Sequence, residues 1–130
     1  MTAAPARPDL NAHGQAIRIG VPELVANLRD LLGARLVAYI AGVTETRAVR
    51  QWADGERTIR NEDDVQRLRI AYQAALMITA RDSREVAQSW FQGLNPQLND
   101  ESPTRQLRES KPDEGGRKVL AAARSFAGVG

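Results

Sequence analysis

Apolar side chains recur at helical spacing along most of the chain, and nowhere do they alternate as a half-buried strand requires. The first clear run begins at Val21 and ends at Gly33, and two shorter runs follow at 36–40 and 46–53. Gly42 lies between the two short runs, where a tight turn needs a flexible residue. The pattern predicts three helices, of which the last two are short and closely connected.

The longest predicted helix begins after Asn61. Asn61 is a good N-cap, and the three acidic residues at 62–64 suit the positive end of a helix dipole. Apolar residues then lie on nearly every face as far as Ala80, which is typical of a helix buried on several sides. We expect this helix to run through the middle of the fold or to supply a dimer face.

Two further helices are predicted after residue 80. One begins at Asp82 or Ser83 and ends at Gly93, where we expect a left-handed glycine. Pro96 then prevents the helix from resuming. The pair Ser102-Pro103 supplies an N-cap and a first helical residue for the other, which is short.

The two ends of the chain differ from its middle. Residues 111–116, KPDEGG, are predicted to be a linker to a final amphipathic helix, and residues 1–20 lack an apolar period and are predicted to be a disordered arm. The chain is therefore predicted to be all-α, with about seven helices. We expect a helical domain at 21–80 and a C-terminal helical domain at 81–130, which share one compact unit.

The composition excludes several classes of chemistry. The chain of 130 residues has no cysteine and a single histidine, His13, so neither a disulfide, a zinc site nor a cysteine nucleophile is expected. It has no glycine-rich phosphate loop and no set of serine, histidine and acid, so we predict no enzyme, cofactor or metal. No apolar run is long enough for a membrane span or a leader, and we expect a soluble, cytoplasmic protein.

The charge balance limits how the chain could bind nucleic acid. Its 18 basic and 16 acidic residues give a net charge of +2, and no segment is a polybasic tail. All of its basic residues except Lys111 and Lys118 are arginines. If the chain binds DNA, a few arginines on one face must supply the phosphate contacts, and a dimer would double that face.

The stretch 36–60 has the residue types that a helix-turn-helix requires. These are a small residue, a turn glycine and apolar residues that fix the second helix to the core: Ala38, Gly42, Val43, Val49 and Trp52. Outward positions on that second helix can reach bases and phosphates in a major groove, and the loop after it can hold the backbone. The candidate DNA-binding residues are Thr46, Arg47, Arg50, Gln51, Arg57 and Arg60. The alternative is a plain helical packing unit whose arginines are only solvated.

Two segments carry a resemblance to known proteins. The sequence VRQWADGER at 49–57 resembles the Xre class of helix-turn-helix domains. The second segment is similar to the C-terminal domain of Xre/MbcA/ParS-type antitoxins, through the pair Trp90-Phe91, the LNP turn at 94–96 and the helix start Ser102-Pro103. The pattern of that family often has glycines where this chain has Asn99-Asp100. The resemblance covers about residues 21 to 127 in the domain order of that family.

The resemblance implies a protein partner, a RES-domain toxin that acts on NAD and whose active-site cleft the antitoxin covers. It also implies operator binding by the helix-turn-helix, in a homodimer or a higher toxin-antitoxin assembly. We expect Trp90 to be a core aromatic and the partner surface to lie beyond it, because arginine and aromatic anchors dominate interfaces. The candidate partner-binding residues are Arg105, Arg108, Lys118, Arg124 and Phe126. The alternative is a stand-alone Xre-type transcriptional regulator that acts as a dimer.

Overall fold

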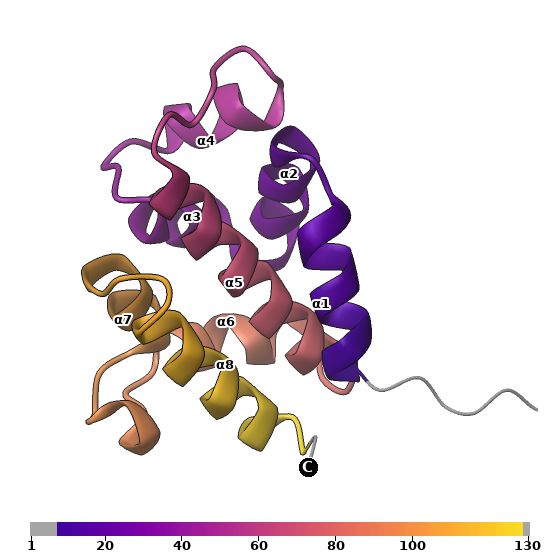
Figure 1. Ribbon diagram of the computed structural model, residues 1–130, viewed down its shortest axis with the longest axis vertical. Helices are drawn as coiled ribbons and strands as arrows, with labels where there is room; N and C mark the ends of the chain where they lie inside the picture. Colours follow the sequence, from indigo (N-terminus) through magenta and orange to yellow (C-terminus); the bar gives the residue numbers. More distant parts are fainter. Residues whose placement is uncertain (1–7, 129–130) are drawn as a thin grey trace, which may run out of the picture.

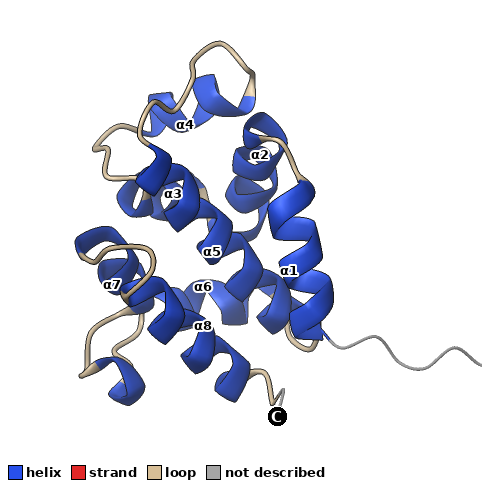
Figure 2. Cartoon of the chain, in the orientation of Figure 1, coloured by secondary structure: helices blue, strands red, loops and turns tan. Residues whose placement is uncertain are grey.

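The computed structural model describes residues 8–128, which form helices joined by loops (Figures 1 and 2). Within these residues the predicted all-α fold is confirmed, with eight α-helices and a short 3-10 helix, η1, against about seven expected. The elements are α1 (Pro8–Arg18), α2 (Val21–Leu32), α3 (Ala34–Ile40), α4 (Thr46–Ala53), α5 (Glu62–Thr79), α6 (Arg84–Gln92), η1 (Pro96–Leu98), α7 (Pro103–Glu109) and α8 (Gly115–Phe126).

Helix α5 runs through the middle of the molecule, with α1, α2, α6 and α8 packed around it (Figure 1). Its N-terminus is capped as expected, since the Asn61 side-chain oxygen accepts a hydrogen bond of 2.8 Å from the backbone N–H of Asp63. Its buried residues lie on several faces: Val65, Leu68, Ala71, Tyr72, Ala74, Ala75, Met77 and Ile78. Helix α5 therefore has the first of its two expected roles, that of a central helix, because helices of the same chain cover its apolar faces.

Helix α1 corrects the expectation of a disordered arm at 1–20, of which residues 1–7 lie outside the described residues. Ala12 and Ala16 are each 1% exposed and belong to the core. On α5, Arg69 donates from Nη1 to the backbone oxygens of Ala16 at 2.9 Å and Ile19 at 2.7 Å. The helix forms because alanines allow close packing and because a partly buried arginine binds carbonyls at its end that have no partner within the helix.

The two expected domains share a single hydrophobic cluster that extends from Ala12 to Ala127. Phe91 is fully buried and Trp90 is 9% exposed, with the two rings in an edge contact at 5.0 Å. The Thr104 hydroxyl donates to the backbone oxygen of Phe91 at 3.1 Å, which ties α7 to the end of α6. Trp90 is therefore a core aromatic, as expected.

The expected left-handed conformation at Gly93 is wrong. Gly93 ends α6 with φ −80° and ψ 154°, because the chain leaves the helix extended and forms a bridge in which the N–H of Asn95 donates to the oxygen of Glu101 at 3.1 Å. Positive φ angles occur instead at Asn99, with 55°, and Asp100, with 62°. These two residues make the left-handed turn that closes the bridge.

The segment 111–116 is not a simple linker, because its last two residues begin α8 and are buried. A Cβ atom added to Gly115 would lie 2.9 Å from the backbone oxygen of Gln106 and closer still to the Ser110 side chain. A Cβ atom at Gly116 would collide with the terminal methyl of Ile70. The glycines therefore allow α8 to pack tightly against α7 and α5, which the glycine-rich sequence alone does not reveal.

Candidate nucleic-acid interface

Helices α3 and α4 are joined by a tight turn in which Gly42 has a φ of 79°. The N–H of Gly42 donates to the oxygen of Tyr39 at 3.1 Å, and the N–H of Val43 donates to that of Ala38 at 3.0 Å. The predicted pair of short helices around a glycine turn is therefore present. The buried side of α4 packs on α2 and α3 through three residues, Ala48, Val49 and Trp52.

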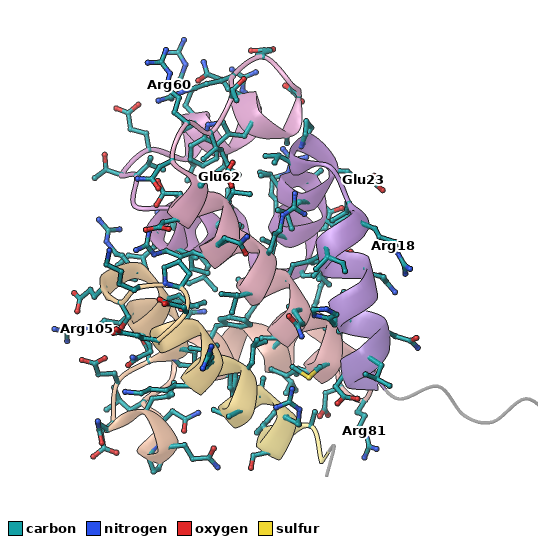
Figure 3. The ribbon with its side chains drawn as sticks, in the orientation of Figure 1. Arg18, Glu23, Arg60, Glu62, Arg81 and Arg105 are labelled. Carbon is teal, nitrogen blue, oxygen red and sulfur yellow. The ribbon has the colours of Figure 1, made fainter. Side chains whose placement is uncertain are left out.

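The residues predicted to bind DNA lie on α4 and on the loop that follows it. Thr46, Arg47 and Arg50 are exposed on α4, whereas Gln51 is half-buried. Arg57 and Arg60 are exposed in the loop, and Arg60 points away from the body of the protein at the top of Figure 3. The structure thus gathers the predicted set at one end of the molecule, with only Gln51 partly withdrawn.

Two of these arginines have intramolecular partners. Arg50 forms ion pairs with Asp54 at 3.4 Å and Glu56 at 3.7 Å, and the three side chains are about half exposed. Arg57 lies with its guanidinium 5.9 Å from the centre of the Trp52 ring. A phosphate that approaches Arg50 must compete with two carboxylates, so the first half of α4 is the more open to an anion.

A hollow of about 640 Å³ lies where α3, the turn, the start of α4 and α7 meet. It contains three arginines from three different helices and a single carboxylate, that of Glu45. The charge around this hollow is therefore positive, although the whole chain is close to neutral. The residues that line it are Arg35, Ala38, Tyr39, Val43, Thr44, Glu45, Thr46, Arg47 and Arg108.

Arg108 was expected to bind a partner protein, but it is packed against α3. Its Nη1 donates to the backbone oxygen of Tyr39 at 3.1 Å, and its guanidinium lies 4.5 Å from the centre of the Tyr39 ring. The cation above the ring and the hydrogen bond at the end of α3 both stabilise this position. The second half of the chain thus places an arginine beside the turn that joins α3 to α4.

The other candidate partner-binding residues lie on α7 and α8. Arg105 points outward from α7 (Figure 3), and its hydrogen bond to Glu109, with the attraction of that carboxylate, raises the pKa of the guanidinium. Arg124 on α8 lies 3.6 Å from the carboxylate of Asp9 on α1. Lys118 is exposed on α8, and Phe126 is 49% exposed at its end, where its ring is 6.1 Å from that of Trp90.

A second hollow, of about 460 Å³ and mainly apolar, separates α6 from the end of α8. Its lining includes Trp90 and Val86 of α6, Leu94 and Phe126. Leu94 is 78% exposed, because the extended chain before Pro96 carries it away from the core. Phe126 was among the candidate partner-binding residues, whereas Leu94 was not.

Four residues of the arginine-lined hollow were also missed in the sequence: Arg35, Tyr39, Thr44 and Glu45. Arg35 and Tyr39 are four residues apart and therefore share a face of α3, which is a signal that the helical pattern contains. Glu45 precedes α4 as its N-cap residue. No comparable signal brings Arg108 to this place, because it lies 69 residues beyond its partner Tyr39.

Comparison of the chain with protein-family models, curated proteins and solved structures gave no match. Within residues 8–128, no group of three acidic, histidine or cysteine side chains is placed to hold a metal ion. In the same part of the chain, no helix combines the length and apolar character that a membrane crossing needs.

Proposed function

We propose that the chain binds double-stranded DNA through α3 and α4, used as a helix-turn-helix. The observation that supports this proposal is the arrangement of α4, which buries one side and presents Thr46, Arg47 and Arg50 on the other. Short helices held in this way can enter a major groove with their first residues against the bases. The exposed Arg57 and Arg60 follow at the same end of the molecule, where they suit phosphate contacts.

The proposal agrees with the small net charge. A chain with a net charge of +2 has little general attraction to DNA, so affinity must come from arginines that are locally concentrated. The hollow beside α4 has this local excess of positive charge. The same face contains no lysine, and guanidinium groups suit both bidentate contacts to guanine and contacts to phosphate.

The test begins with selection of a duplex from a random pool by the full-length chain. Arg47→Ala and Arg50→Ala should each weaken binding to the selected duplex by about tenfold or more, whereas Arg57→Ala should weaken all duplexes and reduce the salt slope by about one. Arg81→Ala is the control, because this exposed arginine lies at the opposite end of the molecule (Figure 3). Failure to enrich a sequence, or unchanged binding by the first three variants, would overturn the proposal.

We further propose that the second half binds a protein partner at the apolar hollow. Leu94 and Phe126 are 78% and 49% exposed beside Trp90, and large apolar side chains gathered on a surface mark interaction sites. Asn99 and Asp100, which stand where the resembled pattern often has glycines, adopt the positive φ angles that glycine favours. This agreement supports an antitoxin-like protein that neutralises a RES-domain toxin acting on NAD.

The partner is tested by recovery of bound proteins from the native cells with the full-length chain. We expect a RES-domain protein to be recovered by the wild type and lost with Leu94→Glu and Phe126→Glu. Leu10→Glu is the matched control, since Leu10 is a 63% exposed leucine on α1. Removal of α8 is not a suitable variant, because Val119 is fully buried. Recovery of no stoichiometric partner, with DNA binding retained, would favour the stand-alone dimeric regulator.

A further inference from the structure

We propose that the hollow between α3, α4 and α7 binds a phosphodiester group of the DNA backbone, and that Arg108 from the second half of the chain completes this site. The inference rests on the proposed DNA binding and extends it, because it assigns part of the DNA interface to α7. The resemblance to a helix-turn-helix domain does not include this helix.

Three arginines converge on the hollow from separate helices, Arg35 on α3, Arg47 on α4 and Arg108 on α7. Among the described residues, no carboxylate forms an ion pair with any of the three, unlike Arg50 and its two acidic neighbours. Uncompensated cations on one face repel one another and favour an anion between them. The hollow therefore has the charge that an anionic ligand requires.

Arg108 is held in place before any ligand arrives. The Tyr39 ring lies under its guanidinium, and one of its N–H groups donates to the Tyr39 backbone oxygen. A guanidinium has several further N–H donors, so the remaining ones are available to a second acceptor. Because the side chain is already ordered, binding an anion there costs little additional conformational entropy.

The position of the hollow favours a phosphate of DNA over a free anion. Thr46 and Arg47, which line it, are also the first residues of α4 and belong to the proposed base-contacting face. Phosphates border the major groove that such a helix enters, so a bound duplex brings a backbone phosphate close to this point. Glu45 is the only carboxylate in the lining, and it should weaken the attraction for any anion.

The experiment measures binding of the full-length chain to a fluorescent random-sequence duplex of about 20 base pairs while salt is varied from about 50 to 200 mM. Arg35→Ala, Arg47→Ala and Arg108→Gln should each lower the salt slope by up to about 0.9, the value for a phosphate contact that is lost completely. Arg108→Gln removes the charge but keeps a polar side chain, and Arg108→Lys keeps the charge and should retain the slope. Glu45→Gln should strengthen binding, and Arg81→Ala should leave the slope unchanged.

The outcomes separate this inference from the function on which it rests. If the wild type binds no duplex at the lowest salt, the proposed DNA binding and the inference both fail. If Arg47→Ala lowers the slope but Arg108→Gln behaves like Arg81→Ala, DNA binding stands and the role of α7 is overturned. Thermal unfolding of each variant shows whether a loss of binding reflects a loss of fold. If Arg108→Gln does not fold, Arg108→Met replaces it, because methionine keeps an aliphatic stem over the Tyr39 ring without the charge, and an unchanged slope in that variant would overturn the role of α7.

A second arm distinguishes the backbone phosphate from free phosphate. Inorganic phosphate is added in place of chloride at equal ionic strength, and its effect on DNA binding and on thermal unfolding is measured. For a backbone site we expect inorganic phosphate to compete no better than ionic strength predicts. Competition beyond chloride, together with a rise in the melting temperature that Arg108→Gln abolishes, would assign the hollow to a free phosphate-type anion instead.

Discussion

Replacement of Gly115 by alanine tests whether α8 is packed against α7 as the structure shows. Gly115 is buried at the first position of α8. The added methyl would approach the backbone oxygen of Gln106 to 2.9 Å and would come under 3.0 Å from the Ser110 side chain. Backbone atoms cannot rotate away, so the helix itself has to shift. Gly116 is the natural comparison, because there the added methyl meets only the Ile70 side chain.

The expected change in the free energy of unfolding is the sum of two opposing effects. Glycine to alanine within a helix is worth up to about 1 kcal/mol of stabilisation. Overpacking in a close contact costs about 1–3 kcal/mol. At Gly115 the overpacking is against the backbone and dominates, which leaves a net loss of about 1–2 kcal/mol. At Gly116 the terminal methyl of Ile70 can move, so we expect a net change of about zero.

Thermal and urea unfolding of both variants provide the measurement. A loss of 1–2 kcal/mol corresponds to a fall in melting temperature of about 4–8 °C for a domain of this size. Ile70→Val removes the methyl that Gly116→Ala would meet, so the double variant should show a favourable coupling of about 0.5–1 kcal/mol. If Gly115→Ala is as stable as the wild type or more so, the 111–116 segment is a flexible linker after all and the packing of α8 is wrong.

Three further predictions concern single contacts. Asn61→Ala should cost about 1 kcal/mol in urea unfolding through loss of the α5 cap, and Asn61→Asp should restore it. Arg69→Ala should speed amide hydrogen exchange in α1 more than in α5 at a cost of about 1.5–3 kcal/mol, and equal exchange in the two helices would contradict the anchoring role. The pKa of Glu85 is lowered, chiefly by a hydrogen bond with its own backbone N–H, so its stabilisation is present above the ordinary pKa and lost as pH falls through the lowered value. NMR titration of the wild type checks the lowered pKa, and urea unfolding of the wild type and Glu85→Gln at several pH values checks the loss of stabilisation.

Much of the helical structure follows from local signals in the sequence. The apolar run from Val21 to Gly33 matches α2, the residues 46–53 match α4, and Asn61 caps α5 as its side chain predicts. Each of these signals acts within a few residues, through a side chain that caps a helix end or an apolar face that repeats at the helical period. The all-α fold could therefore be predicted without any knowledge of what each helix contacts.

The wrong expectations share a physical cause. Helix α1 depends on alanines at 12 and 16, whose small size matters only because α5 lies against them, and on Arg69, which is 50 or more residues away in the chain. The glycines at 115 and 116 resemble a linker until α7 and Ile70 are placed beside them. A close contact of this kind depends on the partner, and the partner is not adjacent in sequence.

Some residues of the candidate site could also be named from the sequence, and others could not. The outward positions of α4 are determined by the helical pattern around Val49 and Trp52, so Arg47 and Arg50 could be named from the sequence. The hollow beside them could not, because it needs Arg108 from α7 to reach Tyr39 on α3. The sequence by itself determines which residues form helices and which sides they bury, since both depend on neighbours along the chain. Only tertiary packing decides which charges meet at one surface, since that depends on helices that are distant in sequence.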